Sequence, residues 1–348
     1  MAGLRIFGVS VAVTAAAMVA GYLHGGPTAM LLLAALALLE VSLSFDNAVV
    51  NASVLRQLSP FWQRMFLTIG IVIAVFGTRL VFPLVIVWLT TDLDPLAGGA
   101  PGSPGYQHLI TAAHPQIAAF GGMFLLMVFL DFAFHDRDVK WLTWVERPLA
   151  RIGRTGQQPV ALAGALLLLI GAHVTDSGAD RAQVLTAGVV GLVAFLVVTS
   201  LAGVLAPPGR GAGRIVGRAG LVVFLYLETL DGAFSLDGVT GAFAITADPV
   251  IIALGLGLIG AVFVRSITVY LVRHDVLERY VYLEHGAHWA IGALAVILLL
   301  SVDQRFRVPE VVTALVGVVV IGAATGWSMR SRRRSAPGPS ERPPYVAG

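Results

Sequence analysis

Apolar stretches long enough to cross a bilayer follow one another along most of the chain. A transmembrane helix needs about 20 mostly apolar residues, and short polar segments separate the stretches here. The predicted spans are residues 7–23, 28–55, 65–89, 117–134, 160–172, 184–206, 219–246, 250–272, 288–302 and 311–327. This pattern predicts an all-α, polytopic membrane protein with about ten transmembrane helices.

The composition is typical of a membrane protein and argues against disulfide bonds, thiolate metal sites and nucleic-acid binding. Hydrophobic residues make up 57% of the chain and charged residues 12%, and the mean hydropathy is +0.84. The lack of cysteine excludes disulfide bonds and thiolate metal sites. The basic residues lie in loops rather than on one basic face, so we expect a lipid bilayer and no nucleic acid as partner. We expect one transmembrane domain over residues 1–330 and a disordered cytoplasmic tail over 331–348.

The distribution of positive charge predicts the orientation in the membrane. Of the 23 Lys and Arg, 18 fall in one set of alternating loops and three in the opposite set. Cytoplasmic loops carry the excess of Lys and Arg, so both termini are predicted to be cytoplasmic in a multi-pass protein of the cytoplasmic membrane. The first apolar stretch has an alternative interpretation as a signal peptide, because Arg5 precedes it and small residues follow.

One polar run interrupts the second predicted span, between Glu40 and Ala48. Glu40, Ser44 and Asn47 are spaced i, i+4, i+7 and share one face of a helix, whereas Asp46 lies about 120° away. Either the helix faces a polar cavity on two sides, or it is interrupted near Ser44. Acids inside apolar spans are costly, so a functional role is the default interpretation.

A second copy of this pattern occurs in the seventh predicted span. Asp231, Ser235 and Asp237 each lie 191 positions after their counterparts in the first copy. Each copy precedes a Gly-bearing span with one arginine, Arg79 or Arg265. The two copies run in opposite directions in the predicted topology, which predicts an inverted repeat of spans 2–4 and 7–9, over residues 28–134 and 219–303. Glycines at 232 and 238 are expected to weaken regular helix in the second copy.

The chemistry of these residues suits a hard cation. Acids outnumber arginines inside the spans, so bound cations or protons have to compensate the excess charge. Carboxylate, hydroxyl and amide oxygens favour Mn²⁺, Ca²⁺ or Mg²⁺. The predicted metal ligands are Glu40, Ser44, Asp46, Asn47, Asp231, Ser235 and Asp237, with Arg79 and Arg265 balancing charge. The predicted function is efflux of a divalent cation, Mn²⁺ or Ca²⁺, by alternating access with proton coupling, and neither a resident cofactor nor enzymatic activity is expected.

Other interpretations of the same residues stay open. The acids could pair with the two arginines only to hold helices together. Asp231 and Asp237 could act as the acid and base of an intramembrane aspartyl hydrolase, and the chain could be a non-transporting membrane partner that assembles or protects other proteins. Glu284 and His288, spaced i, i+4, could share a metal or form an interfacial hydrogen-bonded pair.

The segment from Glu40 to residue 52 resembles the motif of the TerC-like family of integral membrane proteins, which is named for tellurium resistance. Residues 77–83, 230–239 and 282–288 carry further likeness, and the resemblance extends over about 28–302, closest to a branch described as a domain of unknown function. The resemblance implies a cation-exporter group, several of whose members are tied to manganese efflux. The residues that match its motif are Glu40, Asp46, Asn47, Asp231 and Asp237. Gly238 stands where the first copy has Asn47, so the two half-sites are expected to be unequal.

Overall fold

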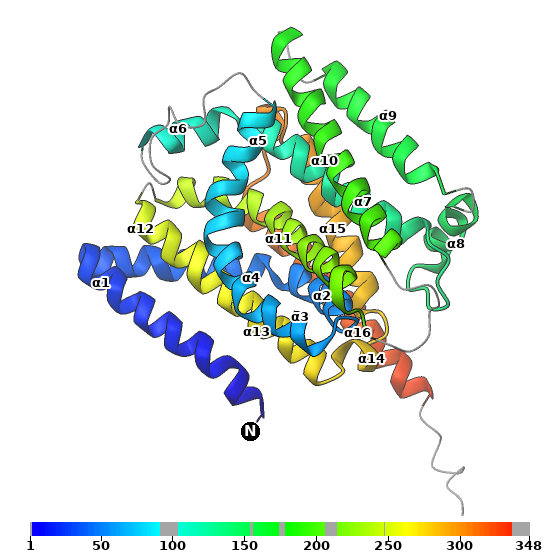
Figure 1. Ribbon diagram of the computed structural model, residues 1–348, viewed down its shortest axis with the longest axis horizontal. Helices are drawn as coiled ribbons and strands as arrows, with labels where there is room; N and C mark the ends of the chain where they lie inside the picture. Colours follow the sequence, from blue (N-terminus) through cyan, green and yellow to red (C-terminus); the bar gives the residue numbers. More distant parts are fainter. Residues whose placement is uncertain are drawn as a thin grey trace, which may run out of the picture.

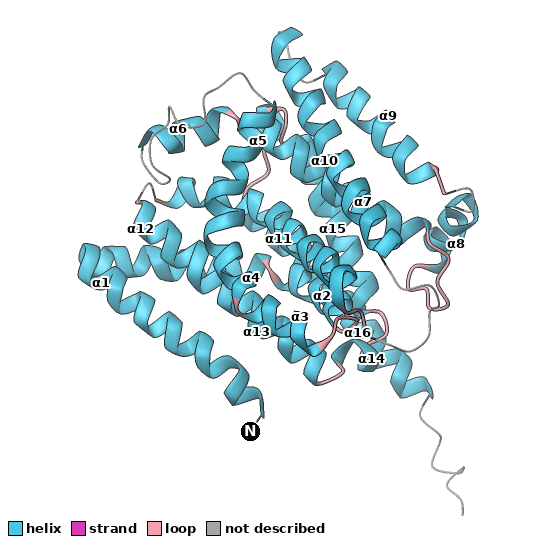
Figure 2. Ribbon diagram, in the orientation of Figure 1, coloured by secondary structure: helices cyan, strands magenta, loops and turns pink. Residues whose placement is uncertain are grey.

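Helices make up nearly all of the chain that the computed structural model describes, which is residues 2–90, 104–153, 156–173, 178–205, 214–246 and 248–335. Within these ranges there is no strand, and one isolated parallel bridge joins Leu58 to Ile215. Figure 2 shows the helical arrangement. The all-α prediction is confirmed for these residues.

The elements of the N-terminal half are α1 (Ala2–Leu43), α2 (Phe45–Leu55), α3 (Pro60–Leu67), α4 (Ile69–Val72), the π-helix η1 (Ile73–Val81), α5 (Phe82–Thr90), α6 (Pro104–Ala112), α7 (His114–Phe134) and α8 (Thr143–Ile152). Those of the C-terminal half are α9 (Gln158–His173), α10 (Gly178–Leu205), α11 (Gly217–Ile245), α12 (Pro249–Ile252), the π-helix η3 (Ala253–Gly260), α13 (Ala261–Arg273), α14 (Val276–Arg279), α15 (Leu283–Leu300), the 3₁₀ turn η4 (Gln304–Phe306) and α16 (Glu310–Ser335). Figure 1 shows their positions.

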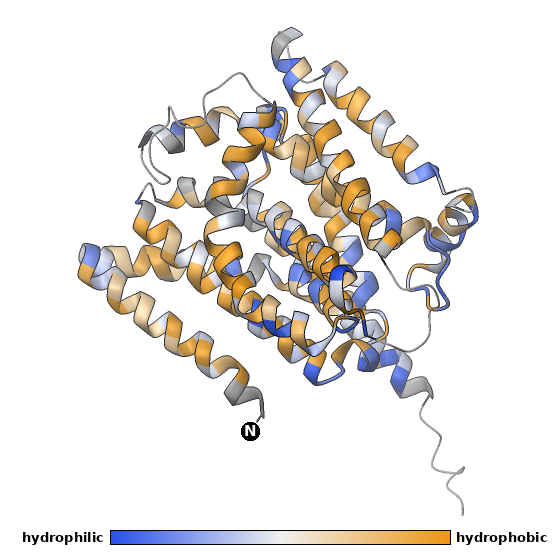
Figure 3. Ribbon diagram, viewed as in Figure 1, coloured by the Kyte–Doolittle hydropathy of each residue, from blue (hydrophilic) through white to orange (hydrophobic). Residues whose placement is uncertain are grey.

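Seven helical stretches in the described part of the chain are long and apolar enough to cross a membrane. They are Ile6–Val41, Pro60–Thr78, His114–Phe134, Asp180–Val204, Val250–Arg273, Leu283–Leu300 and Val312–Arg332. Figure 3 shows apolar residues along these helices and polar segments around α8 and the end of α16. The chain is therefore a multi-pass membrane protein, while the count of ten spans stays a prediction.

The first two predicted spans belong to one bent helix. Gly25 and Gly26 have non-helical dihedral angles within α1, and Gly26 lies at φ 68°, which favours glycine. Pro27 follows and removes a backbone donor at the bend. Figure 1 shows α1 turning back on itself at this point. His24 and Asp248 form an ion pair of 2.8 Å that ties the bend to the segment before α12.

The seventh predicted span is α11, and its helix is more regular than the sequence predicted. Gly232 and Gly238 were expected to weaken the helix, yet α11 is continuous from Gly217 to Ile245. Packing supplies the reason for these glycines: a Cβ at Gly232 would lie 3.1 Å from the Phe82 ring, and one at Gly238 would lie 3.2 Å from Glu40. Neighbouring side chains occupy the space that a larger residue would need, as is common where membrane helices approach closely.

The predicted tail also differs from the structure at its start. Residues 331–335 form the last turn of α16, whereas the predicted tail begins at 331, and the disorder of the tail stays a prediction. The final turns of α16 contain Arg330, Arg332 and Arg333. Cations interact favourably with the helix dipole at a C-terminal end. Residues 336–348 lie outside the described part of the chain.

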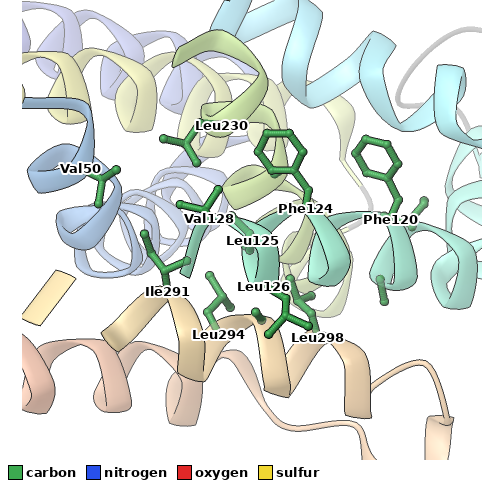
Figure 4. Close-up of a cluster of buried hydrophobic side chains, with 14 of the residues drawn as sticks. Val50, Phe120, Phe124, Leu125, Leu126, Val128, Leu230, Ile291, Leu294 and Leu298 are labelled. Carbon is green, nitrogen blue, oxygen red and sulfur yellow. The ribbon is translucent and has the colours of Figure 1, made fainter. Parts of the chain in front are cut away.

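The core surrounds α7, of whose apolar stretch 89% is buried. α10 and α15 pack along its sides, and α11 also contacts it. Figure 4 shows the side chains that meet here from α2, α7, α11 and α15, namely Val50, Phe124, Leu125, Val128, Leu230, Ile291 and Leu294. This packing fixes α11 and α15 beside α2, which carries the first polar motif.

A buried carboxylate holds the amphipathic helix α8 against the bundle. Glu146 is 5% exposed and accepts hydrogen bonds from the backbone amides of Trp141 and Leu142, from the His285 ring and from Trp289. Burial raises the pKa of Glu146, but the hydrogen bonds from His285, Trp289 and the backbone outweigh it and lower the pKa below its usual range. Glu146 therefore anchors this loop as a carboxylate.

We expect Glu146→Gln to lower the free energy of unfolding by about 1–3 kcal/mol, because the substitution weakens a buried acceptor of several hydrogen bonds. The folded-state pKa is lowered, so the stabilisation exists at neutral pH and is lost as the pH falls through that pKa. Thermal unfolding in detergent should separate the variant from the wild type at pH 7 and bring them together in acid.

Glu278→Gln is the matched control, since Glu278 is exposed in α14. An equal effect of both substitutions at pH 7 would contradict the anchoring role of Glu146.

Candidate functional site

The first polar motif lies at a break between two helices. α1 ends at Leu43, α2 begins at Phe45, and Ser44 between them has φ −96° and ψ 9°. The sequence left open whether the helix faces a polar cavity on two sides or is interrupted near Ser44, and the structure shows the interruption. Asn47 and Asp46 consequently point from the start of α2 into different surroundings.

The two copies of the motif meet through one hydrogen bond. Asn47 Nδ2 donates to Asp231 Oδ1 at 2.7 Å, and the two residues are 2% and 1% exposed. One comes from α2 and the other from α11, which are far apart in sequence. The sequence showed only that the two segments share a pattern. The structure places Asn47 of the first copy in contact with Asp231 of the second.

Further motif residues surround this hydrogen bond. A small cavity of about 20 Å³ is lined by Glu40, Ser44, Asn47, Phe234, Ser235, Gly238 and Leu294. Ser44 Oγ donates to Glu40 Oε1 at 3.1 Å, and Ser235 Oγ donates to the Asp231 backbone carbonyl at 2.7 Å. Five of the seven predicted ligands thus lie at one buried place, namely Glu40, Ser44, Asn47, Asp231 and Ser235. The cavity is about the size of one water molecule.

Glycines make room for the Glu40 side chain. A Cβ added at Gly260, the last residue of η3, would overlap the Glu40 side chain, and Gly238 borders it from α11. Glu40 therefore reaches from α1 toward both the second motif and the second π-helix.

Asn51 extends the polar face beyond the predicted ligands. It is fully buried, and neither its Nδ2 nor its Oδ1 has a hydrogen-bond partner among the described residues. Asn47 Oδ1 has none either. Asn51 follows Asn47 by four residues and thus shares the face of Glu40, Ser44 and Asn47. The same i, i+4, i+7 spacing, continued by one turn, would have identified it from the sequence.

Arg265 balances an acid that was not among the predicted ligands. Its Nη2 lies 3.1 and 3.0 Å from the two oxygens of Glu228 and donates to the Gly70 carbonyl at 3.1 Å. Its guanidinium also lies over the Phe66 ring, 3.5 Å from the centroid. Asp231 Oδ2 is 4.0 Å from the same nitrogen. Asp231 therefore lies between Arg265 and Asn47 and joins the ion pair to the motif residues.

Asp46 lines a different cavity from the other motif residues. This second cavity, of about 550 Å³, lies between Asp46 and residues of α15 and α16, and Leu294 borders both cavities. Asp46 Oδ1 accepts a hydrogen bond from the Asn47 backbone at 2.9 Å. The remaining predicted residues, Asp237 and Arg79, have side chains outside the described part of the structure.

No group of three or more His, Asp or Glu that could hold a metal was found among the described residues. The oxygen donors at the Asn47–Asp231 contact are a mixture of carboxylates, an amide and hydroxyls, and the Asp237 side chain lies outside the described residues. The residues present fit a hard cation by the chemistry of their donors and by the partnerless amide oxygen of Asn47.

Glu284 and His288 do not share a site through their side chains. His288 Nδ1 donates to the Glu284 backbone carbonyl at 2.8 Å, and its ring stacks on Phe132. The Glu284 carboxylate instead lies 3.6 Å from Arg56 and 3.3 Å from Arg137. Of the two interpretations left open, the hydrogen-bonded pair matches the geometry, with the backbone as acceptor.

The two arginine-bearing spans both contain a π-helix. η1 carries Arg79 and packs against α11, while η3 precedes Arg265 and packs against α1. Each π-helix therefore contacts the helix that carries the other copy of the motif. π-helical turns inside α-helices occur frequently at functional sites.

A family model described as "Protein of unknown function (DUF475)" matches residues 45–335. No curated protein and no solved structure matches the chain. Glu40 and Ser44 lie just before the matched segment, whereas Asn47, Asp231 and Ser235 lie within it.

We expect Arg265→Gln to destabilise the protein by about 3–5 kcal/mol, because it leaves Glu228 and Asp231 in a buried place without their cation. Unfolding in a denaturant series should show the loss, and Arg265→Gln combined with Glu228→Gln should recover part of it. Arg279→Gln, in the exposed end of α14, is the control. A double variant as unstable as the sum of the single ones would argue against the pair.

We expect Gly260→Ala to displace Glu40 and lower the free energy of unfolding by about 1–3 kcal/mol, because the added methyl group overlaps a packed side chain. Gly257→Ala is the matched control in the same π-helix, since its Cβ would lie 3.5 Å from Val75, an ordinary contact. Thermal unfolding of both variants measures the difference. Equal stability would mean that Glu40 does not occupy the space beside η3.

Proposed function

This chain belongs to the DUF475 family, and we propose that it is a membrane transporter that exports a divalent metal cation, with Mn²⁺ as the favoured substrate. The observation that carries the proposal is the Asn47–Asp231 hydrogen bond, buried at the meeting point of the two motif copies. Transporters commonly bind substrate at such an interface of helices that are interrupted near the midplane. The break at Ser44 provides an interruption beside this contact.

The balance of buried charge supports a cation as substrate. Among the buried acids, Glu146 is satisfied by its hydrogen bonds from His285 and Trp289. The other four are Glu40, Asp46, Glu228 and Asp231, and Arg265 is the buried arginine in the described part of the chain. Four carboxylates against one guanidinium leave an excess of negative charge that a low-dielectric interior does not sustain without bound cations or protons. Exchange of a divalent cation for protons would keep this charge nearly constant, so proton-coupled antiport is the proposed mechanism.

The residues at this place define the proposed ligand set. Glu40 and Asp231 supply carboxylates, Asn47 supplies its partnerless amide oxygen, and Ser44 and Ser235 supply hydroxyls. Asp237, which lies two residues after Ser235 in the second motif, completes the proposed set. Hard oxygen donors favour Mn²⁺, Ca²⁺ or Mg²⁺, and the likeness of the motif to TerC-like proteins favours Mn²⁺. Arg265, 4.0 Å from Asp231, would stabilise the site when it is empty.

The reciprocal packing of the π-helices supports an inverted repeat as the basis of alternating access. η1 packs on α11 and η3 packs on α1, as a two-fold relation between residues 28–134 and 219–303 requires. In the proposed topology ten spans cross the cytoplasmic membrane with both termini in the cytoplasm. Asn51 lies one turn beyond Asn47 toward Arg56, which places its amide on the proposed cytoplasmic path to the site.

Mn²⁺ flux into proteoliposomes tests the proposal. We expect saturable uptake by the wild type and at least about a tenfold loss of rate in Asp231→Asn and in Glu40→Gln, because each removes a charged ligand. Asn51→Leu should slow the flux, since it removes a polar side chain from the proposed path to the site.

Asp138→Asn is the control for altered charge, because Asp138 is exposed and does not line the cavity of the motif residues. Circular dichroism and thermal unfolding identify variants that fail to fold. If no divalent cation is transported, or if folded Asp231→Asn transports at the wild-type rate, the proposal is wrong.

A further inference from the structure

The cavity beside Asp46 is a separate feature from the proposed metal site. It has a volume of about 550 Å³ and lies between the Asp46 end of α1 and α2, Leu294 of α15 and one side of α16. The α16 residues that line it run from Thr313 to Thr325, so the cavity follows the helix for about 18 Å. Such a long, narrow cavity suits an extended molecule.

Most of the cavity wall is apolar. Val41 and Phe45 line it from the end of α1 and the start of α2, and Val318, Ile321, Gly317 and Gly322 line it from α16. A Cβ added at either glycine would meet nothing within 4 Å, so the two glycines leave open space. An alkyl chain laid along α16 would bury its surface against these residues.

One charged group interrupts the apolar wall. Asp46 is 6% exposed and is the charged residue among those that line the cavity. Its carboxylate accepts hydrogen bonds from backbone amides, that of Asn47 among them, and no ion pair of Asp46 is present among the described residues. A buried carboxylate without a cation is costly, so a cationic group would be stabilised there.

A second polar group in the cavity also lacks a partner. Thr313 is 6% exposed, and its hydroxyl has no hydrogen-bond partner in the described structure. The hydroxyl can accept a hydrogen bond from an N–H donor. None of the described residues that line the cavity is Lys or Arg, so these residues offer no cation for the phosphate of a zwitterionic lipid headgroup.

We propose that this cavity binds a single-chain amphiphilic amine, with its ammonium group at the Asp46 carboxylate and its alkyl chain along α16. The ammonium supplies the charge-assisted hydrogen bonds that Asp46 lacks. Asp46 is not one of the proposed metal ligands, so binding of the amine can be measured separately from the proposed transport of a metal.

Calorimetric titration of octylamine into the full chain in phosphatidylcholine nanodiscs tests this site, with empty nanodiscs subtracted. The neutral probe of equal length is 1-octanol. We expect saturable binding of octylamine about tenfold or more tighter than that of octanol, and a loss of about tenfold in Asp46→Asn, because a charged hydrogen bond is removed.

Two variants on α16 test the position of the alkyl chain. Gly317→Leu and Gly322→Leu would fill the cavity and weaken octylamine binding, whereas Gly326→Leu should not, because Gly326 also has open space around it but does not line the cavity. These variants keep the test valid if Asp46→Asn fails to fold.

Three results would overturn the proposal. Equal binding of octylamine and octanol, with no loss in Asp46→Asn, would mean that only acyl chains enter the cavity. Equal effects of leucine at 317, 322 and 326 would place the amine elsewhere. Loss of octylamine binding when phosphatidylethanolamine is added to the nanodiscs would assign the cavity to a lipid headgroup. Loss of Mn²⁺ flux in Asp231→Asn with octylamine binding retained would support two separate sites.

Discussion

The burial of several carboxylates inside an apolar helical bundle is the constraint on which the rest of the structure depends. A charge in such surroundings has to be paired, hydrogen-bonded or compensated by a mobile ion. Arg265 neutralises Glu228 and lies near Asp231, and Asn47 donates to Asp231 from the other motif. These contacts join α2, α11 and α13, so the polar groups also determine how the helices at the centre are arranged.

Close packing makes this arrangement possible. α7 is buried along most of its length and sets the separation between α11, α15 and α2. Glycines at 238 and 260 leave space into which Glu40 extends. Because membrane helices gain little from the hydrophobic effect within lipid, close approach through small residues and buried polar contacts is a main source of their association. The same feature that stabilises the bundle thus creates the polar centre to which we assign the cation.

The two carboxylates of the first motif have different surroundings despite their closeness in sequence. Glu40 lies in the small cavity with the second motif, whereas Asp46 lines the long apolar cavity beside α16. The Glu40 and Asp46 side chains point in different directions because they lie about 120° apart around the helix axis and because the helix is interrupted at Ser44 between them. In our two proposals, one short segment serves a small hard cation and an amphiphilic amine, because the two cavities differ in size and polarity.

The sequence by itself determined the all-helical membrane class, the two polar motifs and most of the residues at their meeting point, because apolar span length and helical spacing are local properties. The tertiary structure alone decided that Arg265 pairs with Glu228, that Asp46 leaves the cluster, and that Glu146 anchors α8. It also showed that α11 is a continuous helix, although Gly232 and Gly238 were expected to weaken regular helix there. These outcomes depend on which side chains from distant segments occupy the same space, and no local pattern of residues contains that information.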